Sequence, residues 1–314
     1  MSNEKVVCIG GGTGLSTMLR GLKEHTEELT AIVTVADNGG SSGDLRKDLN
    51  ILPPGDIRNC LAALADAEPL VRNLLQHRFS DGVFKGHSLG NLFIAGMADM
   101  TGNFGMAVEM AHKVLRVKGK VLPVTLEDVQ LCASYDDGSQ VVGETQIVAA
   151  NKSHNKRVKA MSLIPERPRV HKTVLASIDE ADIIVLGPGS LYTSIIPNLL
   201  VEGVCEAIRA AKGQVVYVCN IMTQPGETDG FTLMEHVRVI EEYLGEGIIQ
   251  HIIANDSWPD TDIIEHYNQD GAALVLPLEE DPRIVAIPMV ALDRFHGYVR
   301  HDSDVLSDAL MSLK

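Results

Sequence analysis

The sequence predicts an α/β fold, a Rossmann-like and mostly parallel sheet with helices on both faces and a small antiparallel β insertion. Short apolar runs typical of buried strands alternate along the chain with apolar residues at helical spacing. Several of these runs end in polar, glycine-rich segments, as strands do in βαβ units. The chain has 314 residues, 45% of them hydrophobic, so it can bury a large core. Aromatic residues make up only 4%, and that core must therefore be aliphatic.

The first unit combines a strand, a glycine turn and a helix. The apolar run at residues 6–9 leads directly into the turn at 10–14, and apolar residues follow at helical spacing over 15–22. Glycines let backbone N–H groups approach an anion, and a helix N-terminus adds its positive dipole end. Residue 15 is leucine where the dinucleotide motif has its third glycine, and the Lys-Ser/Thr of a Walker A loop is missing. The turn therefore predicts a phosphate-like ligand, with a purely structural turn as the alternative.

A second strand over residues 29–35 ends in a polar loop at 36–43. Asp37 stands in this loop, about 20 residues after the glycine turn, where an acidic residue commonly meets a ribose. Asp37 and Asn38 are candidates to hold a ribose, a sugar hydroxyl or a metal. The alternative is that they only satisfy the backbone of their own turn.

Two further polar turns open helices. Asp56 and Asn59 lie one helical turn apart and can point into one cleft, although Asp56 could equally be only a helix cap. Ser88 and Asn91 stand at the start of the next helix, where a capped helix N-terminus explains them as well as a function does. Met97, Met106 and Met110 fall in the helices that follow, and we expect them in the core.

We expect one Rossmann-like domain over residues 1–314, interrupted by the antiparallel insertion at about 118–166. Short alternating runs at 120–124, 129–133 and 140–143, and a hairpin signal at 136–139, mark this insertion. The polar, basic residues 151–157 are expected to be exposed.

The α/β pattern resumes with a strand over 182–186 and a second glycine turn at 187–190. Because parallel strands end at one edge of a sheet, this turn should face residues 10–14 across a ligand. Tyr192 and Ser194 follow it and could donate hydrogen bonds, although Tyr192 could simply pack. A strand over 214–219 ends in a third polar loop at 220–230.

Two residues near the carboxyl end of the sequence are further candidates. Arg300 can clamp a diphosphate, since a guanidinium matches phosphate geometry, and a surface salt bridge is the alternative. Ser303 is predicted to cap the last helix, with phosphorylation as a second interpretation.

Composition excludes several classes of protein. The net charge of −15 argues against a nucleic-acid binder. Five cysteines without a CxxC pair indicate neither a disulfide framework nor a metal site, so we predict no metal ligands. We find no signal peptide and no run of transmembrane length, and expect a cytoplasmic protein. No Gly-x-Ser-x-Gly elbow or Cys/His arrangement is evident, so no catalytic residue is predicted.

Six loops taken together resemble the YvcK/CofD-like family, and more narrowly its gluconeogenesis-factor (YvcK) branch. They span residues 10–16, 35–43, 53–59, 86–91, 186–194 and 220–230. The resemblance covers nearly the whole chain. It implies a Rossmann-like fold with a nucleotide-type ligand at the carboxyl edge of the sheet. It also implies a cytoplasmic protein needed for cell shape and wall synthesis on gluconeogenic carbon sources, associated with UDP-sugars such as UDP-N-acetylglucosamine.

The other branch, 2-phospho-L-lactate transferase, uses Mg²⁺ and carries two adjacent acids after the second strand. This chain has Asp37 and Asn38 there, and an amide is a poor Mg²⁺ ligand. The departure favours a UDP-sugar-binding regulatory protein without turnover over the alternative, a Mg²⁺-dependent transferase of a nucleotide-linked phosphoester. NAD binding is a lesser alternative by analogy of fold. The sequence leaves open whether the protein has a partner in cell-wall metabolism and whether it forms a homo-oligomer.

The residues predicted to bind the ligand come from both glycine turns, the loops after the first strands and the last hairpin. They are Gly10, Gly11, Gly12, Thr13, Gly14, Asp37, Asn38, Gly39, Asp56, Asn59, Ser88, Asn91, Gly187, Pro188, Gly189, Ser190, Tyr192, Ser194 and Arg300.

Overall fold

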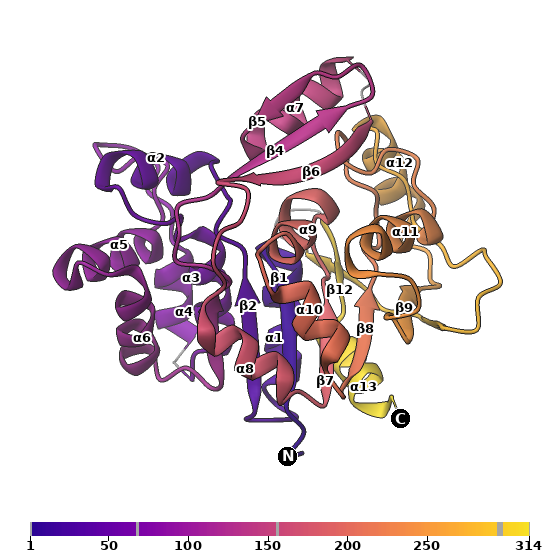
Figure 1. The fold of residues 1–314 in the computed structure, drawn as a ribbon, viewed down its shortest axis with the longest axis horizontal. Coiled ribbons are helices and arrows are strands. Elements are labelled where there is room, and N and C mark those ends of the chain that lie inside the picture. Colours follow the sequence, from indigo (N-terminus) through magenta and orange to yellow (C-terminus); the bar gives the residue numbers. More distant parts are fainter. Residues whose placement is uncertain (1, 67–68, 155–156, 294–297, 314) are drawn as a thin grey trace.

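A parallel sheet of seven strands, in the order β10-β9-β8-β7-β1-β2-β3, forms the centre of the computed structural model (Figure 1). The structure describes residues 2–66, 69–154, 157–293 and 298–313. The strands are β1 (Val6–Gly10), β2 (Leu29–Val33), β3 (Lys120–Pro123), β7 (Ile183–Leu186), β8 (Gln214–Val218), β9 (His251–Asn255) and β10 (Ile284–Ile287). The order reverses between β1 and β7, and α/β sheets bind ligands at such a switch point. The predicted Rossmann-like class is confirmed.

Helices cover both faces of this sheet (Figure 1). One layer holds α1 (Gly12–Leu22) between α3 (Gly55–Leu64) and α13 (Ser303–Ser312), and the other holds α8 (Lys172–Asp179), α10 (Val204–Ala210) and α11 (Leu233–Leu244). Every residue of β1 and β2 is buried, which explains why these strands are continuous apolar runs. The apolar stripe of α1 is buried as well, including Leu15 and Leu22.

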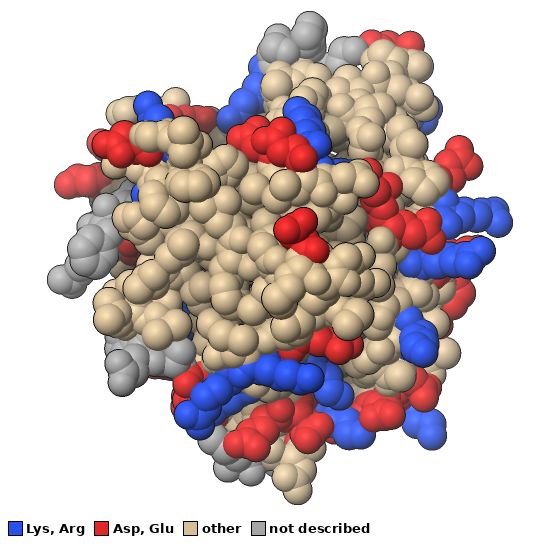
Figure 2. All heavy atoms as spheres, turned by 90° about the vertical axis from the view of Figure 1, so that its left-hand side faces the viewer, with Lys and Arg blue, Asp and Glu red and all other residues tan. Residues whose placement is uncertain are grey.

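Four further helices extend the layer of α3 beyond the β3 edge of the sheet. They are α2 (Gly40–Leu49), α4 (Pro69–Gln76), α5 (Leu89–Thr101) and α6 (Phe104–Leu115). Few charged side chains cover the middle of this face (Figure 2). The prediction for α6 was wrong in part, because Met106 is 54% exposed while Met97 is buried and Met110 packs against the core. The buried stripe of α6 includes the small residues Ala107 and Ala111, which allow close packing.

A second sheet of three antiparallel strands lies above the carboxyl ends of the parallel strands (Figure 1). It consists of β4 (Gln130–Tyr135), β5 (Gln140–Val142) and β6 (Val158–Ile164), and α7 (Glu144–His154) packs on it. Residues 120–123 were predicted to belong to the antiparallel insertion, and this prediction was wrong, because they pair in parallel with β2. The sequence also gave no sign of α7. Asn151, expected to be exposed, is buried at the end of α7 and accepts a hydrogen bond from the Tyr135 hydroxyl at 2.6 Å.

The remaining elements border the same edge. A π-helical turn, η1 (Leu191–Ile195), runs into α9 (Ile196–Leu199), and α12 (Thr261–Gln269) precedes the hairpin β11 (Val290–Asp293) and β12 (Tyr298–His301). Ser303 does not cap α13, because Asp302 accepts hydrogen bonds from the N–H groups of Asp304 and Val305. No helix in the described ranges is both long and apolar enough to cross a membrane.

The contact between α1 and α13 requires a glycine. A Cβ atom at Gly21 would overlap the Ser303 carbonyl oxygen and the Ser307 hydroxyl. Gly21→Ala should therefore lower the free energy of unfolding, by about 1–3 kcal/mol as in other overpacked sites. Thermal and urea unfolding measure the change.

Gly96→Ala is the matched control, because Gly96 also lies within a helix, α5, and a Cβ atom there meets nothing within 4 Å. This variant should be more stable than the wild type by about 0.5–1 kcal/mol. Equal stability of the two variants would contradict the close contact at Gly21.

Candidate ligand site at the carboxyl edge of the sheet

A cavity of ≈ 650 Å³ opens at the switch point, beside the first turn of α1. The glycine turn after β1, the turn after β7, the loop after β8 and strand β12 form its walls. Its lining includes Gly11, Gly12, Thr13, Gly14, Lys152, Gly189, Ser190, Ser194, Asn220, Thr223, Gln224, Tyr267, Asp270, Tyr298, Arg300 and His301. Its volume lies in the usual range for small-molecule sites.

The two glycine turns touch each other directly. A Cβ atom on Gly14 would lie 2.6 Å from the Pro188 carbonyl oxygen, and one on Gly11 would lie 2.5 Å from Asp56 Oδ2. Gly187 adopts φ +81°, a conformation that favours glycine. Gly14 must be glycine because the backbone of the other turn lies too close for a side chain, and Gly11 because the side chains of Asp56 and Thr34 do. The turns therefore form one wall together, and do not face each other across the ligand as we expected.

Some of the backbone N–H groups in this wall already have acceptors. The Gly12 N–H donates to Asp56, and the Gly189 N–H donates to Asn220 Oδ1 at 3.1 Å. The N–H groups of Thr13 and Gly14 belong to the first turn of α1, where a helix offers no internal acceptor. Thr13 and Gly14 are thus the backbone donors that α1 offers to an anion.

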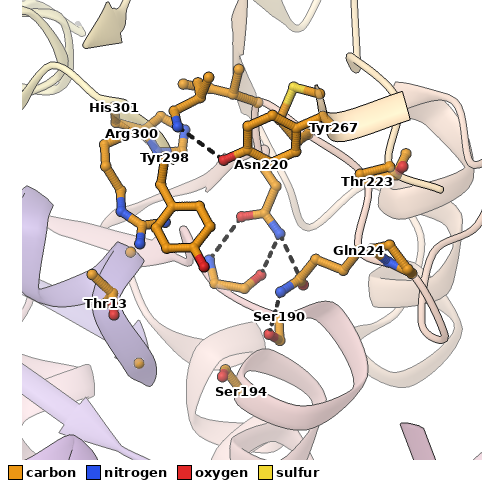
Figure 3. Close-up of a pocket in the computed structure, with 18 of the residues that line it drawn as sticks. Thr13, Ser190, Ser194, Asn220, Thr223, Gln224, Tyr267, Tyr298, Arg300 and His301 are labelled. Atoms are coloured by element: carbon orange, nitrogen blue, oxygen red, sulfur yellow. Dashed lines mark hydrogen bonds between the residues drawn. The ribbon is translucent and has the colours of Figure 1, made fainter. Parts of the chain in front are cut away.

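Side chains from the loop after β8 hold the turn after β7 in place. Asn220 Nδ2 donates to the Gly189 carbonyl at 2.8 Å, and Gln224 Nε2 donates to Ser190 Oγ at 2.7 Å (Figure 3). Asn220 thus bonds both backbone groups of Gly189. This arrangement fixes the wall of the cavity before any ligand arrives, which lowers the entropic cost of binding.

Two cationic side chains border the cavity, Arg300 on β12 and Lys152 on α7. Arg300 and Thr13 lie on the same side of it (Figure 3). The Arg300 guanidinium carbon lies 5.1 Å from the centre of the Tyr298 ring, a cation–π distance. None of the ion pairs formed within the described ranges includes Arg300, so the salt-bridge alternative finds no support.

We call the wall formed by the two glycine turns the glycine wall. A group of buried carboxyls lies behind it and does not line the cavity. Burial and the charge of Asp37 raise the pKa of Asp56 to about 7. Burial also places the pKa of Glu144 well above its usual range, and the charge of Asp37 and a hydrogen bond to it add to this shift. Burial raises the pKa of Glu227 to about 7, although the Thr193 hydroxyl donates to it. These groups bind protons near neutral pH.

These acids do not suit a Mg²⁺ ion as they are arranged. Asp37 Oδ1 accepts from the Gly39 N–H at 2.7 Å, and Asp37 shares a hydrogen bond with Glu144. Asn38 is bound to α7, where its amide donates to Gln146 Oε1 at 2.8 Å. Within the described residues, no group of three or more His, Cys, Asp or Glu side chains could hold a metal ion. The donors are occupied by contacts within the protein.

Several predicted residues lie away from this cavity. Ser88 caps α5, accepting from the Asn91 N–H, while Asn91 Nδ2 donates to Ser41 Oγ at 3.1 Å. Tyr192 is buried and packs edge-on against Phe231, with ring centres 6.4 Å apart. These are structural roles.

The other predicted residues surround or support the cavity. Gly10, Gly187 and Pro188 lie in the turns beneath it, and Asp37, Gly39 and Asp56 lie in the polar layer behind the glycine wall. Asn59 lines a different cavity, described below.

Sequence reasoning missed Lys152, Asn220, Gln224, Tyr267 and Tyr298 as lining residues. Asn220 and Gln224 belong to a polar loop after a strand, which was a usable signal. Lys152, Tyr267 and Tyr298 reach the cavity from α7, α12 and β12, which no local pattern connects to the sheet edge.

Comparison with known proteins assigns the chain to one family. The profile described as 2-phospho-L-lactate transferase CofD matches residues 6–291, so the chain belongs to this family. This confirms the resemblance to the YvcK/CofD-like family.

Within this class, the chain is similar to proteins named gluconeogenesis factor. The protein of Bacillus subtilis (strain 168) is 45% identical over 314 residues, covering 98% of both chains. That of Halalkalibacterium halodurans is 44% identical over 320 residues, covering 100% of this chain and 98% of the relative. A crystal structure of a Bacillus halodurans protein matches with a TM-score of 0.93 at 42% identity, covering 98% of this chain and 100% of that one.

The raised pKa of Glu144 predicts how stability depends on pH. The folded protein keeps a proton that the unfolded chain releases above its ordinary pKa of 4.5. This contribution to stability is complete below that value and is lost as the pH rises toward the folded pKa. Glu144→Gln keeps a neutral donor for Asp37. The variant should therefore gain stability relative to the wild type between about pH 5 and about pH 9.

Urea unfolding across this pH range measures the difference. Glu265→Gln, at an exposed carboxyl on α12, is the control and should follow the wild type at every pH. A difference between Glu144→Gln and the wild type that stays constant with pH would rule out a buried, protonated Glu144.

Proposed function

We propose that this chain is a cytoplasmic regulatory protein that binds a UDP-sugar, such as UDP-N-acetylglucosamine, without turnover. In this proposal it acts as a gluconeogenesis factor, needed for cell shape and wall synthesis on gluconeogenic carbon sources. One observation carries the proposal. The cavity at the switch point combines the N-terminal turn of α1 with an arginine that forms no ion pair within the described residues.

A diphosphate is the ligand group that these features suit. The N–H groups of Thr13 and Gly14 and the dipole of α1 favour an anion, and Arg300 can donate two parallel hydrogen bonds to it. Lys152, which reaches the cavity from α7, adds a second positive charge. A nucleotide-sugar presents two phosphates with polar groups on either side of them.

The rest of the lining suits the two ends of such a ligand. The hydroxyls of Ser190, Ser194 and Thr223 can bond sugar or ribose hydroxyls. The rings of Tyr267 and Tyr298 offer flat apolar surfaces for a base or a sugar face. These features support the ligand class, and the names of the similar proteins support the role in gluconeogenesis.

The state of the acids supports a role without catalysis. Asp56 and Glu144 are held behind the glycine wall with raised pKa values, and Asn38 takes part in the attachment of α7. A transferase would need acids directed at the ligand or at a metal bound to it. The polar layer here supports the wall of the cavity.

Isothermal titration calorimetry with UDP-N-acetylglucosamine tests this function. The wild type should bind, and Arg300→Ala should bind about 10–100-fold more weakly, because a hydrogen bond to a charged group contributes about 1.5–3 kcal/mol. Arg238→Ala, which removes an exposed arginine on α11, is the control and should bind like the wild type. Absence of binding by folded wild-type protein would refute the proposal.

A Mg²⁺-dependent transferase of a nucleotide-linked phosphoester is the second candidate, because the chain belongs to a family described by that activity. Asp37 and Asp56, which lie together behind the glycine wall, are the candidate acids for such a reaction. Formation of product from a nucleotide-linked phosphoester and an acceptor, abolished in Asp37→Ala, would establish this function in place of the first. Tight binding of UDP-N-acetylglucosamine without any product favours the regulatory protein.

A further inference from the structure

A second cavity, of ≈ 550 Å³, adjoins the first one. Thr13, Tyr298 and Arg300 line both cavities, so the two adjoin at the first turn of α1 and at strand β12. The remaining walls of the second cavity come from α1, α3, α4 and the end of β11, and these walls include Arg20 and Arg72. The UDP-sugar proposal makes no use of this space.

Three arginines therefore surround one cavity in a protein that has 27 basic and 42 acidic residues. None of the ion pairs among the described residues involves Arg20, Arg72 or Arg300. Positive charges gathered in this way repel one another, and an anion placed between them removes that repulsion.

The direction of the pKa shift of Arg20 agrees with a cluster of positive charges in this cavity. Burial lowers the pKa of Arg20, and the charges of Arg72 and Arg300 lower it further. Asp293 is the carboxylate in the wall, and its charge acts on Arg20 in the opposite direction. Among the described residues of the lining there are one carboxylate and three guanidinium groups, so this part of the lining is positive.

The other polar residues of the lining are amides and hydroxyls. Asn59 and Asn73 can donate and accept hydrogen bonds. Gln76 Oε1 accepts from Arg58 at 2.6 Å, which leaves its amide N–H groups as donors. An arginine binds a phosphate through two parallel hydrogen bonds, and such amides suit hydroxyl groups beside it.

We propose that this second cavity is an anion-binding site for a small molecule that carries a phosphate group. Arg20, Arg72 and Arg300 bind the phosphate, and Asn59, Asn73 and Gln76 bind hydroxyl groups next to it. Arg20, Arg72 and the three amides do not line the first cavity, so the two sites are separate although they share one wall. The site does not depend on the identity of the ligand in the first cavity.

Calorimetry on the whole protein with glucose 6-phosphate as the probe tests this site. The wild type should bind it, neutral glucose should not bind, and Arg72→Gln should weaken binding by about tenfold or more. Arg20→Gln provides a second, independent variant, and Arg238→Gln is the matched control on α11. Inorganic phosphate distinguishes the source of the anion. Equal affinity for both probes indicates free phosphate, and tighter binding of glucose 6-phosphate indicates a phosphorylated metabolite.

Two results would overturn the proposal. The first is that the wild type binds neither probe, or that Arg20→Gln and Arg72→Gln both bind them like the wild type. The second is that Arg72→Gln weakens binding of UDP-N-acetylglucosamine, because the cavity would then be an extension of the first site. A protein that binds glucose 6-phosphate but no UDP-sugar would support the second site while refuting the function proposed for the first.

Discussion

The architecture depends on the close contact between the first turn of α1 and the turn after β7. No side chain can be placed between them, since a Cβ on Gly14 would approach the Pro188 carbonyl to 2.6 Å. This contact closes the switch point of the sheet on one side and displaces the ligand cavity toward the loop after β8 and strand β12. It also explains why the chain has glycines here without the spacing of a dinucleotide motif. The glycines serve close contact within the protein.

The same contact creates a polar layer behind the glycine wall. Asp56 accepts the Gly12 N–H, and its carboxyl lies close to Asp37 and Glu144 in space that water enters poorly. Carboxyls in such a place hold protons that they would lose in water. Family membership alone suggests acids that bind a metal or act on a substrate. The hydrogen bonds of this chain indicate acids that fasten α7 and the loop after β2 to the sheet.

Strand β12 connects the two cavities. Arg300 borders both, and the ring of Tyr298 lies against its guanidinium. An arginine with two anionic neighbours makes their binding interdependent, and such coupling acts equally in both directions. In the function proposed above, this coupling lets occupancy of one site change the affinity of the other.

The sequence by itself determined the fold class, the first strand–turn–helix–strand unit, and the polar loops that follow the strands. Those features depend on local patterns, namely buried apolar runs, helical spacing and glycine turns. Each such pattern is formed by residues that are close together in the sequence. Only the tertiary structure decided which polar residues share a cavity. Asn59 and Arg300 border the second cavity although they lie far apart in the sequence. Asn91 turns away to α2, and β3 joins the parallel sheet. Helix packing and strand pairing over long sequence separations fix these positions, and no local pattern contains them.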